Sequence, residues 1–372
     1  MQQLDIGIDV SDAVGLGVTA VVSATVVLPA PDTLPARPVV CFAMPSSSYA
    51  RGYYTCALPG APTAPDIGAQ AAFHAERGWI FVALDWLGCD AAPAGEDARA
   101  NGARSAIDPE DLGYGVLAAA AHAAQAEIVL RLANGLLAPG YPPVAGACVI
   151  GIGQSLGGAL LVCQQARHGS FDGVAVLGFS AVHSHPATPP GGAPVVVAWY
   201  PRDARLDECR EPLNAAALAA ALAPSGTAPA QAAWEAVAWG FHYDDVPVEV
   251  VEQDLAHYEG IARGGDPDGP SPPWYARRTP QRAARSTLTP GVVATEAAAI
   301  TVPVLAAMGV RDLVPDPRGE PRAYASACSV DLFVCPRMGH VHNMAGTRAL
   351  LWDRIDLFGR WCSEVKSAGA AG

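Results

Sequence analysis

The first apolar pattern in the chain is an alternation near its N-terminus. Residues 13–31 carry no charged side chain, and apolar residues occupy every even position from Leu16 to Leu28. A stretch of this length approaches the roughly 20 residues that span a bilayer, but a two-residue period is that of a strand with one buried face. The pattern therefore predicts a long edge strand or hairpin arm and argues against a membrane-spanning helix.

After this segment the alternation gives way to continuous apolar runs of strand length. These runs cover residues 37–43, 79–84, 147–152, 173–179, 301–308 and 330–335. The stretches typical of helices lie at residues 65–77, 110–137, 156–168 and 347–362. Strands that are apolar on both faces belong to sheets covered by helices on both sides. The order of elements thus predicts an α/β fold with a mostly parallel central sheet and helices on both faces.

The alternation of predicted strands and helices is interrupted between residues 183 and 300. This segment contains Pro- and Gly-rich loops, an Ala-rich helical stretch at 213–222 and a surface-loop composition at 264–273. No strand of parallel-sheet character is evident in its sequence, so we interpret it as an insertion into the sheet domain. The expected organisation is a core domain formed by residues 1–182 and 301–372, with residues 183–300 as a cap or lid.

Charge and lysine usage exclude several classes of function. The chain holds 23 basic and 36 acidic residues, a net charge of −13, which offers a nucleic acid or an anionic membrane no basic surface. Lys366, close to the C-terminus, is its one lysine. A Walker A phosphate loop and a Schiff-base cofactor site each need an internal lysine, so neither a P-loop enzyme nor a pyridoxal-phosphate enzyme is expected.

The cysteines and the first residues bear on the compartment. The nine cysteines form no CxxC pair, and several lie within apolar runs, as buried thiols do in a reducing environment. The opening sequence MQQLDIGIDV has neither the basic region nor the continuous apolar stretch of a signal peptide. We therefore expect a cytoplasmic protein, and the sequence leaves its oligomeric state open, a homodimer included.

A GxSxG pentapeptide at residues 153–157 is the sharpest chemical feature. It follows the apolar run that ends at Ile152 and opens into a helical stretch from Leu156, so Ser155 is expected on a turn between a strand and a helix. In such a turn the flanking glycines permit the strained backbone that exposes a serine hydroxyl, and the helix N-terminus directs free N–H groups toward it. This context favours a nucleophilic serine over a serine that only caps a helix.

A serine nucleophile needs an imidazole base and a carboxylate that orients the imidazole. Asp312 and His340 each follow one of the last two apolar runs, so both belong at the carboxyl ends of strands. The order Ser155, Asp312, His340 along the chain is the one that accompanies this serine motif. Asp316 is an alternative acid, unless it serves a turn, and His342 is an alternative base.

These motifs resemble the α/β-hydrolase superfamily, from about residue 35 to residue 361. The matching pieces are the serine turn GQSLGG, the acid loop GVRDLVP, the histidine loop PRMGH and an insertion after the sixth strand, as in members with a lid. A further match is MPSSSY at residues 44–49, where family members carry a glycine-rich oxyanion loop, although serines replace the glycines here. The resemblance implies a catalytic triad and an oxyanion hole made by the amide of Leu156 with that of Ser47 or of Ser46.

The aromatic residues indicate where a substrate would bind. Aromatic residues concentrate in residues 183–300 and predict a mostly apolar pocket between lid and sheet. The candidates for the pocket lining are Trp86, Trp239, Tyr243 and His342.

Two His-x-His pairs raise the question of a metal. His183 with His185, and His340 with His342, would point the same way on extended segments. The sequence offers no carboxylate or cysteine set spaced to complete a metal shell, so neither a metal nor another cofactor is expected.

The sequence thus predicts a serine hydrolase that cleaves a carboxylic ester or lactone of a hydrophobic small molecule through an acyl-enzyme. An acyltransferase, or a hydrolase of amide, thioester or carbon–carbon bonds, would use the same three residues. A non-catalytic ligand-binding protein on this scaffold and a metal-dependent hydrolase represent different classes of function that the sequence leaves open. The expected partner is a hydrophobic small-molecule substrate, with no nucleic acid and no membrane.

Overall fold

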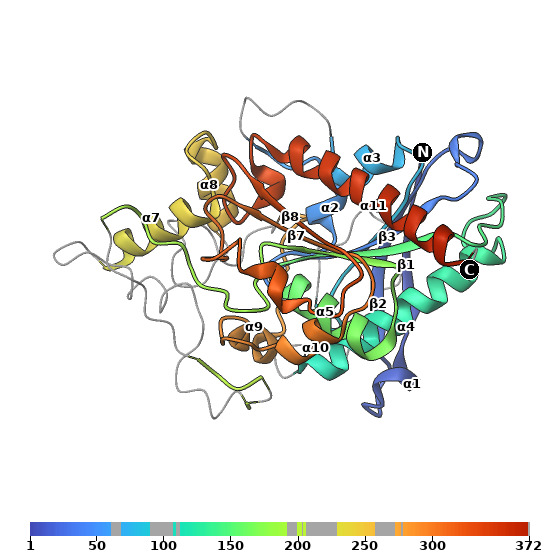
Figure 1. Ribbon diagram of the computed structural model, residues 1–372, viewed down its shortest axis with the longest axis horizontal. Helices are drawn as coiled ribbons and strands as arrows, with labels where there is room; N and C mark the ends of the chain where they lie inside the picture. The colour runs from blue at the N-terminus through green and yellow to red at the C-terminus, as the bar shows by residue number, and fades with distance from the viewer. Residues whose placement is uncertain are drawn as a thin grey trace.

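One sheet runs through the middle of the molecule (Figure 1). The computed structural model describes residues 1–60, 68–89, 107–108, 112–191, 199–202, 204–205, 229–256, 272–276 and 278–370. The strands are β1 (Gln2–Asp9), β2 (Val21–Leu28), β3 (Val39–Met44), β4 (Ile80–Leu84), β5 (Cys148–Gln154), β6 (Gly173–Leu177), β7 (Val304–Gly309) and β8 (Val330–Cys335). Their order across the 8-stranded sheet is β1-β2-β4-β3-β5-β6-β7-β8.

The sheet is mostly parallel, as the sequence predicts. Neighbouring strands from β4 to β8 all run in the same direction, whereas β1 pairs with β2, and β2 with β4, in antiparallel orientation. Each of the continuous apolar runs forms one of the parallel strands. The carboxyl ends of these strands therefore meet at one edge of the sheet.

The N-terminal segment forms a hairpin arm, as predicted, but neither an edge strand nor a strand with one buried face. The even positions of β2 from Val22 to Leu28 are buried, and so are Thr25 and Val27, since β2 lies between β1 and β4 in the sheet. Leu16 and Val18 are exposed and precede the strand, because the chain first forms the short helix α1 (Ser11–Val14) and a turn. β1 is not predicted from the sequence, because its polar residues weaken its alternation.

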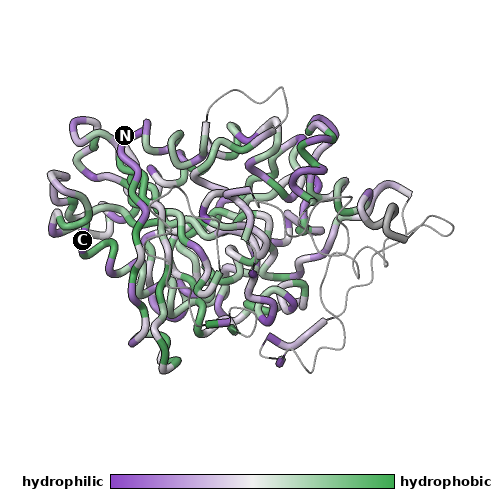
Figure 2. The backbone as a smooth tube through the Cα atoms, turned by 180° about the vertical axis from the view of Figure 1, so that it is seen from behind, coloured by the Kyte–Doolittle hydropathy of each residue, from purple (hydrophilic) through white to green (hydrophobic). Residues whose placement is uncertain are grey.

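A layer of helices covers each face of the sheet (Figure 1). One layer contains α4 (Tyr114–Ala133), α5 (Leu156–His168) and α10 (Ala294–Ala299), and the other contains α3 (Gln70–Ala75) and α11 (Arg348–Ala370). Phe42 of β3 packs in the first apolar cluster and its neighbour Cys41 in the second. Figure 2 shows hydrophobic stretches along the strands and helices of this core. Burial on both faces is the physical reason for the continuous apolar runs.

The remaining helical segments lie in the connections. They are η1 (Pro31–Thr33), α2 (Gly52–Thr55), α7 (Pro229–Phe241), α8 (Val248–Leu255), α9 (Gln281–Ser286), η5 (Glu320–Ala323) and η6 (His342–Met344). The last helix, α11, continues beyond the predicted end at residue 362. Its final turns are tied to the core because Lys366 Nζ lies 2.7 Å from a carboxylate oxygen of Asp172.

By length and composition α4 is the one helix in the described ranges that could cross a membrane. Its buried residues include Leu117, Ala121, Ala124 and Ile128, and these side chains belong to the apolar cluster on the first face of the sheet. In this structure one side of α4 is buried against the sheet.

The predicted cap, residues 183–300, is described in part. Helices α7 and α8 lie at the end of the sheet away from both termini (Figure 1). Ala283 of α9 and Ala297 of α10, by contrast, pack in the same cluster as α4 and α5. The predicted helix at 213–222 and most of the loop at 264–273 lie outside the described residues. The division into core and cap stays a prediction.

Candidate active site

Ser155 is the single residue between the end of β5 and the start of α5. Its backbone has φ 55° and ψ −119°. Arg337 is the only other non-glycine residue with a positive φ in the part of the chain that the structure describes. Such a conformation is strained in a residue with a Cβ atom and persists where the surrounding structure holds it. The expected turn between a strand and a helix is therefore present at Ser155.

The two glycines of the pentapeptide are required by the close approach of backbone segments. A methyl group on Gly153 would overlap the carbonyl oxygen of Gly157, and a methyl group on Gly157 would overlap the carbonyl oxygens of Met44 and Pro45. The serine turn consequently packs directly against the start of the loop that follows β3. This is the loop for which the sequence predicts an oxyanion hole.

Two amides that the sequence proposes for the oxyanion hole are available there. Leu156 is the first residue of α5, so its N–H group has no acceptor within the helix. Among the described residues, neither the Leu156 amide nor the Ser47 amide donates to a protein acceptor. The Ser46 carbonyl accepts a hydrogen bond from the Tyr49 amide at 3.2 Å, which places Ser47 inside a tight turn. Free amides near a helix N-terminus suit a negatively charged oxygen.

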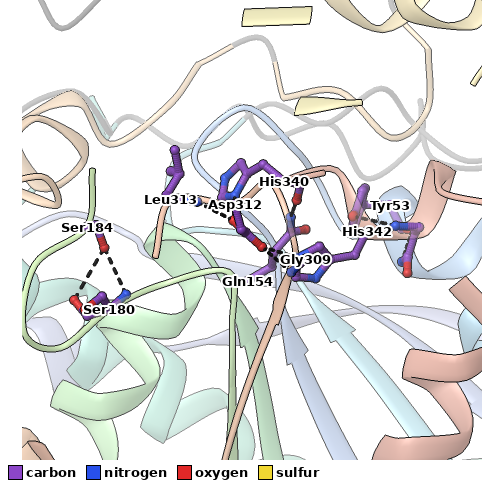
Figure 3. Close-up of polar contacts among 10 residues, drawn as sticks. Tyr53, Gln154, Ser180, Ser184, Gly309, Asp312, Leu313, His340 and His342 are labelled. Carbon is purple, nitrogen blue, oxygen red and sulfur yellow. Dashed lines mark hydrogen bonds and ion pairs between the residues drawn. The ribbon is translucent and has the colours of Figure 1, made fainter. Parts of the chain in front are cut away.

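Asp312 lies in the loop that follows β7 and accepts hydrogen bonds on both carboxylate oxygens (Figure 3). Oδ1 lies 2.7 Å from His340 Nδ1 and 2.7 Å from the Leu313 amide. Oδ2 lies 2.7 Å from His342 Nε2 and 2.9 Å from the Gly309 amide. The carboxylate is thus fully enclosed by donors, as a buried charge must be.

The protonation of Asp312 follows from these neighbours. Burial by itself raises the pKa of the Asp312 carboxyl, since the charged form loses its hydration. Electrostatic attraction to the rings of His340 and His342, and the hydrogen bonds from both rings, outweigh burial and hold the pKa of Asp312 well below its usual range. Asp312 is therefore an anion at neutral pH.

The two histidines use opposite ring nitrogens toward this anion. His340 binds Asp312 through Nδ1. Its other ring nitrogen, Nε2, is not one of the fully buried side-chain nitrogens that have no hydrogen-bond partner. His342 binds through Nε2, and its Nδ1 is buried and has no hydrogen-bond partner among the described residues. Only His340 thus keeps its second nitrogen open toward a reacting group. The geometry favours His340 over His342 as the base.

Backbone and side-chain contacts bring Ser155 to this pair. The Ser155 amide donates to the Leu177 carbonyl at 2.8 Å, and the adjacent Gly178 packs against Asp312 and His340. Gln154 Nε2 donates to the His340 carbonyl (Figure 3). Within the described ranges no hydrogen bond joins the Ser155 hydroxyl to His340 itself. Catalytic hydrogen bonds commonly form only when substrate is bound.

Sequence reasoning did not single out Gln154 or Gly178 as part of this site. Gly178 has φ +57°, and a Cβ atom there would lie 3.1 Å from the Asp312 carboxylate. The glycine therefore provides both the backbone conformation and the space for the acid. The feature of the sequence that could have indicated this role is the position of Gly178 at the end of a strand.

Asp316, the alternative acid, has a different role. Its Oδ1 accepts a hydrogen bond from the Gly319 amide at 3.1 Å, which is the turn interaction that the sequence left open.

The residues proposed for the pocket lining lie in different surroundings. Trp86 is 4% exposed and packs in the first apolar cluster. Trp239 and Tyr243 both pack on the guanidinium of Arg311, whose Cζ lies 4.5 Å and 4.2 Å from the two ring centres. His342 is bound to Asp312. That these side chains line a substrate pocket stays a prediction.

The two His-x-His pairs have different surroundings. The rings of His183 and His185 lie next to each other with an angle of 68° between their planes. His340 and His342 both bind Asp312. The described residues contain no group of three or more His, Cys, Asp or Glu side chains that could hold a metal ion.

Comparison with known proteins gives structural matches alone. No protein-family model and no curated protein matches the sequence. An esterase from Thermogutta terrifontis shares 12% identity at a TM-score of 0.54, over 97% of this chain and 99% of that one. A proline iminopeptidase from Mycobacterium smegmatis shares 13% at 0.52, over 97% and 99%. A lipase described as putative from Acinetobacter baumannii shares 11% at 0.51, over 97% and 92%.

These matches cover almost the whole chain, and the matched structures are α/β-hydrolase folds. At this level of identity a structural likeness concerns the fold. Together with the parallel sheet and the serine turn between β5 and α5, it shows that this chain has the α/β-hydrolase fold.

Proposed function

We propose that the protein is a serine hydrolase that cleaves a carboxylic ester or lactone of a hydrophobic small molecule. The observation that carries the proposal is the 2.7 Å hydrogen bond between Asp312 and His340, formed next to the strained turn of Ser155. An acid, an imidazole with a free second nitrogen and a serine at a helix N-terminus are the parts that acyl transfer to serine requires. The esterase and the lipase with this fold support an ester substrate.

In the proposed reaction the Ser155 hydroxyl attacks the substrate carbonyl carbon. Nε2 of His340 accepts the hydroxyl proton and then delivers it to the departing alkoxide, which leaves an acyl group on Ser155. Asp312 holds the imidazole in one tautomer and stabilises its cationic form. A water molecule, deprotonated by His340, attacks the acyl carbon and releases the acid. No cofactor takes part in these steps.

The negative oxygen of the tetrahedral intermediate needs donors that are already in place. The amide of Leu156 with that of Ser47 is the proposed pair, and Ser46 supplies the alternative amide. One such donor contributes about 3 to 4 kcal/mol to the stability of the transition state in comparable sites. The free amides described above support this assignment.

Replacement of Ser155 tests the proposal directly. We expect Ser155→Ala to lower kcat for p-nitrophenyl acetate by about a thousandfold or more, because the nucleophile is lost. A fluorophosphonate probe should add to the wild-type protein and to the matched control Ser329→Ala, but not to Ser155→Ala. Ser329 lies at the amino end of β8, away from the site. Undiminished turnover by Ser155→Ala, or wild-type protein that neither reacts with the probe nor hydrolyses the ester, would overturn the proposal.

A series of p-nitrophenyl esters tests the nature of the acyl group. If the acyl pocket is apolar, kcat/KM should rise with acyl length over the first few carbons, by up to a few-fold for each buried methylene. A flat or falling series would argue against a hydrophobic substrate while leaving the nucleophile assignment intact.

A further inference from the structure

A second buried polar cluster lies beside the site and consists of Tyr49, His242 and Asp254. The Tyr49 hydroxyl lies 2.9 Å from each carboxylate oxygen of Asp254, and His242 Nε2 lies 3.0 Å from Oδ2. The residues are 1%, 4% and 2% exposed, in that order. Tyr49 belongs to the loop after β3, His242 follows α7 and Asp254 lies in α8. The Asp254 carboxylate therefore joins α8 to the nearby end of α7 and to the loop after β3, which is distant in the sequence.

The cluster has a physical consequence for Tyr49. A buried carboxylate is costly unless donors surround it, and removal of one partner leaves the charge poorly satisfied. The Tyr49 hydroxyl and His242 are donors to Asp254 in this arrangement. The phenol ring of Tyr49 is consequently fixed at its outer end by a charge-assisted hydrogen bond.

Tyr49 also closes the turn that holds the proposed oxyanion amide. Its own amide donates to the Ser46 carbonyl at 3.2 Å, with Ser47 and Ser48 between them. Tyr49 forms a β-bridge with Tyr275. The bridge is flanked by hydrogen bonds from Ala50 N to the Trp274 carbonyl at 2.9 Å and from Ala276 N to the Ser48 carbonyl at 3.0 Å. The side chain and the backbone of Tyr49 therefore anchor the same end of the turn.

The opposite end of this loop is held by the core. Tyr54 donates from its hydroxyl to the Met44 carbonyl at 2.9 Å, and Gly157 of the serine turn packs on that same carbonyl. Residues 44–49 are thus fixed to the sheet at one end and to Asp254 at the other. A short loop held at both ends can present an amide at a defined position.

The Tyr49 ring further connects this cluster to the histidine loop. It stacks on the Tyr53 ring with 4.7 Å between ring centres, and the Tyr53 hydroxyl accepts a hydrogen bond from the Asn343 amide at 3.0 Å. Burial raises the pKa of the Tyr53 hydroxyl, and the nearby carboxylates of Asp254 and Asp312 raise this pKa further. Tyr53 therefore stays protonated between the two acids.

We propose that Asp254, held by His242, is a positioning residue that acts through Tyr49 to fix the Ser46–Tyr49 turn and its oxyanion amide. The inference rests on the proposed serine hydrolase function, because it assigns a task in that reaction. Asp254 touches neither the substrate nor the nucleophile in this role. It determines where the Ser47 amide stands when the carbonyl oxygen becomes negative.

Two isosteric substitutions test the role. Tyr49→Phe keeps the stacked ring and removes the hydroxyl, and Asp254→Asn keeps the shape and removes the charge. We expect each to lower kcat about tenfold with KM changed less than about twofold, since a displaced oxyanion donor acts on the transition state and not on the bound ester. The kcat of the double variant should be close to that of the single variants, because both act on the contact between Tyr49 and residue 254.

A transition-state analogue separates positioning from general loss of structure. A trifluoromethyl ketone forms a negatively charged adduct with the serine, so its inhibition constant should weaken by the same factor as kcat/KM. The inhibition constant of the carboxylic acid product should stay unchanged. The matched control is Tyr141→Phe, which removes a buried hydroxyl that bonds the Pro29 carbonyl far from the site; this variant should keep wild-type kcat.

The outcomes are distinct for the two proposals. Active wild-type protein with wild-type kcat in both Tyr49→Phe and Asp254→Asn would overturn the positioning role and leave the hydrolase proposal standing. A drop in kcat without a matching loss of ketone affinity would also overturn it. Wild-type protein with no hydrolytic activity would overturn both. If Tyr49→Phe does not fold, kcat and the inhibition constant of the ketone are compared between the wild type and the variants Asp254→Asn and His242→Gln.

Discussion

At the scale of single residues, Asp312 binds two histidines that lie two positions apart in the sequence, and it binds each through a different ring nitrogen. His340 turns Nδ1 toward the carboxylate and keeps Nε2 open, whereas His342 turns Nε2 toward it and encloses Nδ1. The two rings approach different oxygens of one anion. We therefore expect His342 to hold the plane of the carboxylate that contacts His340.

Replacement of His342 tests this division. His342→Leu removes the side-chain donor from Oδ2 of Asp312 and leaves the Gly309 amide there. We expect kcat for ester hydrolysis to fall about tenfold with KM unchanged, because a carboxylate free to turn no longer fixes the base. His342→Gln, whose amide nitrogen can donate in the same place, should recover most of this loss in steady-state assays.

A control histidine excludes a general effect of the substitution. His122 of α4 binds Ser170 away from the site, so His122→Leu should retain wild-type kcat. Equal activity in His342→Leu and the wild type would show that His342 does not position Asp312. Failure of His342→Gln to exceed His342→Leu would assign the histidine a packing role only.

At the scale of elements, the register of neighbouring strands brings the site together. Gln154 pairs with Leu177, and Leu177 pairs with Ala307, so β5 and β6 end at the same level and β7 continues for two more residues, to Gly309. The residues that follow these strands, Ser155, Gly178 and Asp312, therefore share one edge. The glycines of the serine turn then let α5 start directly beneath the loop after β3.

Gly157 supplies a test of that close approach. A methyl group in Gly157→Ala would overlap the backbone carbonyls of Met44 and Pro45, which cannot swing aside as a flexible side chain would. The loop after β3 must shift, and we expect kcat to fall about a hundredfold, together with a lower thermal unfolding midpoint. Gly369→Ala near the end of α11 meets no atom within 4 Å and should change neither quantity. Normal kcat in Gly157→Ala would refute the packing argument.

At the scale of the whole molecule, the site depends on segments from the start, middle and end of the chain. The His340 amide donates to the Gly240 carbonyl at 3.0 Å, and the Val341 amide donates to the Phe241 carbonyl at 2.9 Å. The end of α7 thus holds the histidine loop by its backbone. Local changes at the site should consequently appear in the stability of the folded protein.

The pH dependence of unfolding tests this expectation. The pKa of Asp312 is lowered in the folded state, so its charge contributes stability that is present above the pKa of the unfolded chain, about 3.9, and is lost as pH falls below it. Asp312 should account for a loss of up to about 1.4 kcal/mol per pH unit in that range. Urea unfolding at pH 5 and pH 3 should therefore show a smaller pH effect in Asp312→Asn than in the wild type. The same slope in both proteins would contradict the assignment.

The sequence by itself determined the parallel sheet, the place of Ser155 on its turn, and the positions of Asp312 and His340 after strands. These features rest on local periodicity and on residues adjacent in the chain, which a linear pattern records. Only the tertiary structure decided that His340 and His342 share one carboxylate, and that Tyr49 meets Asp254 across a separation of 205 residues. Such partnerships depend on how distant segments approach one another in space, and no spacing along the chain encodes that approach.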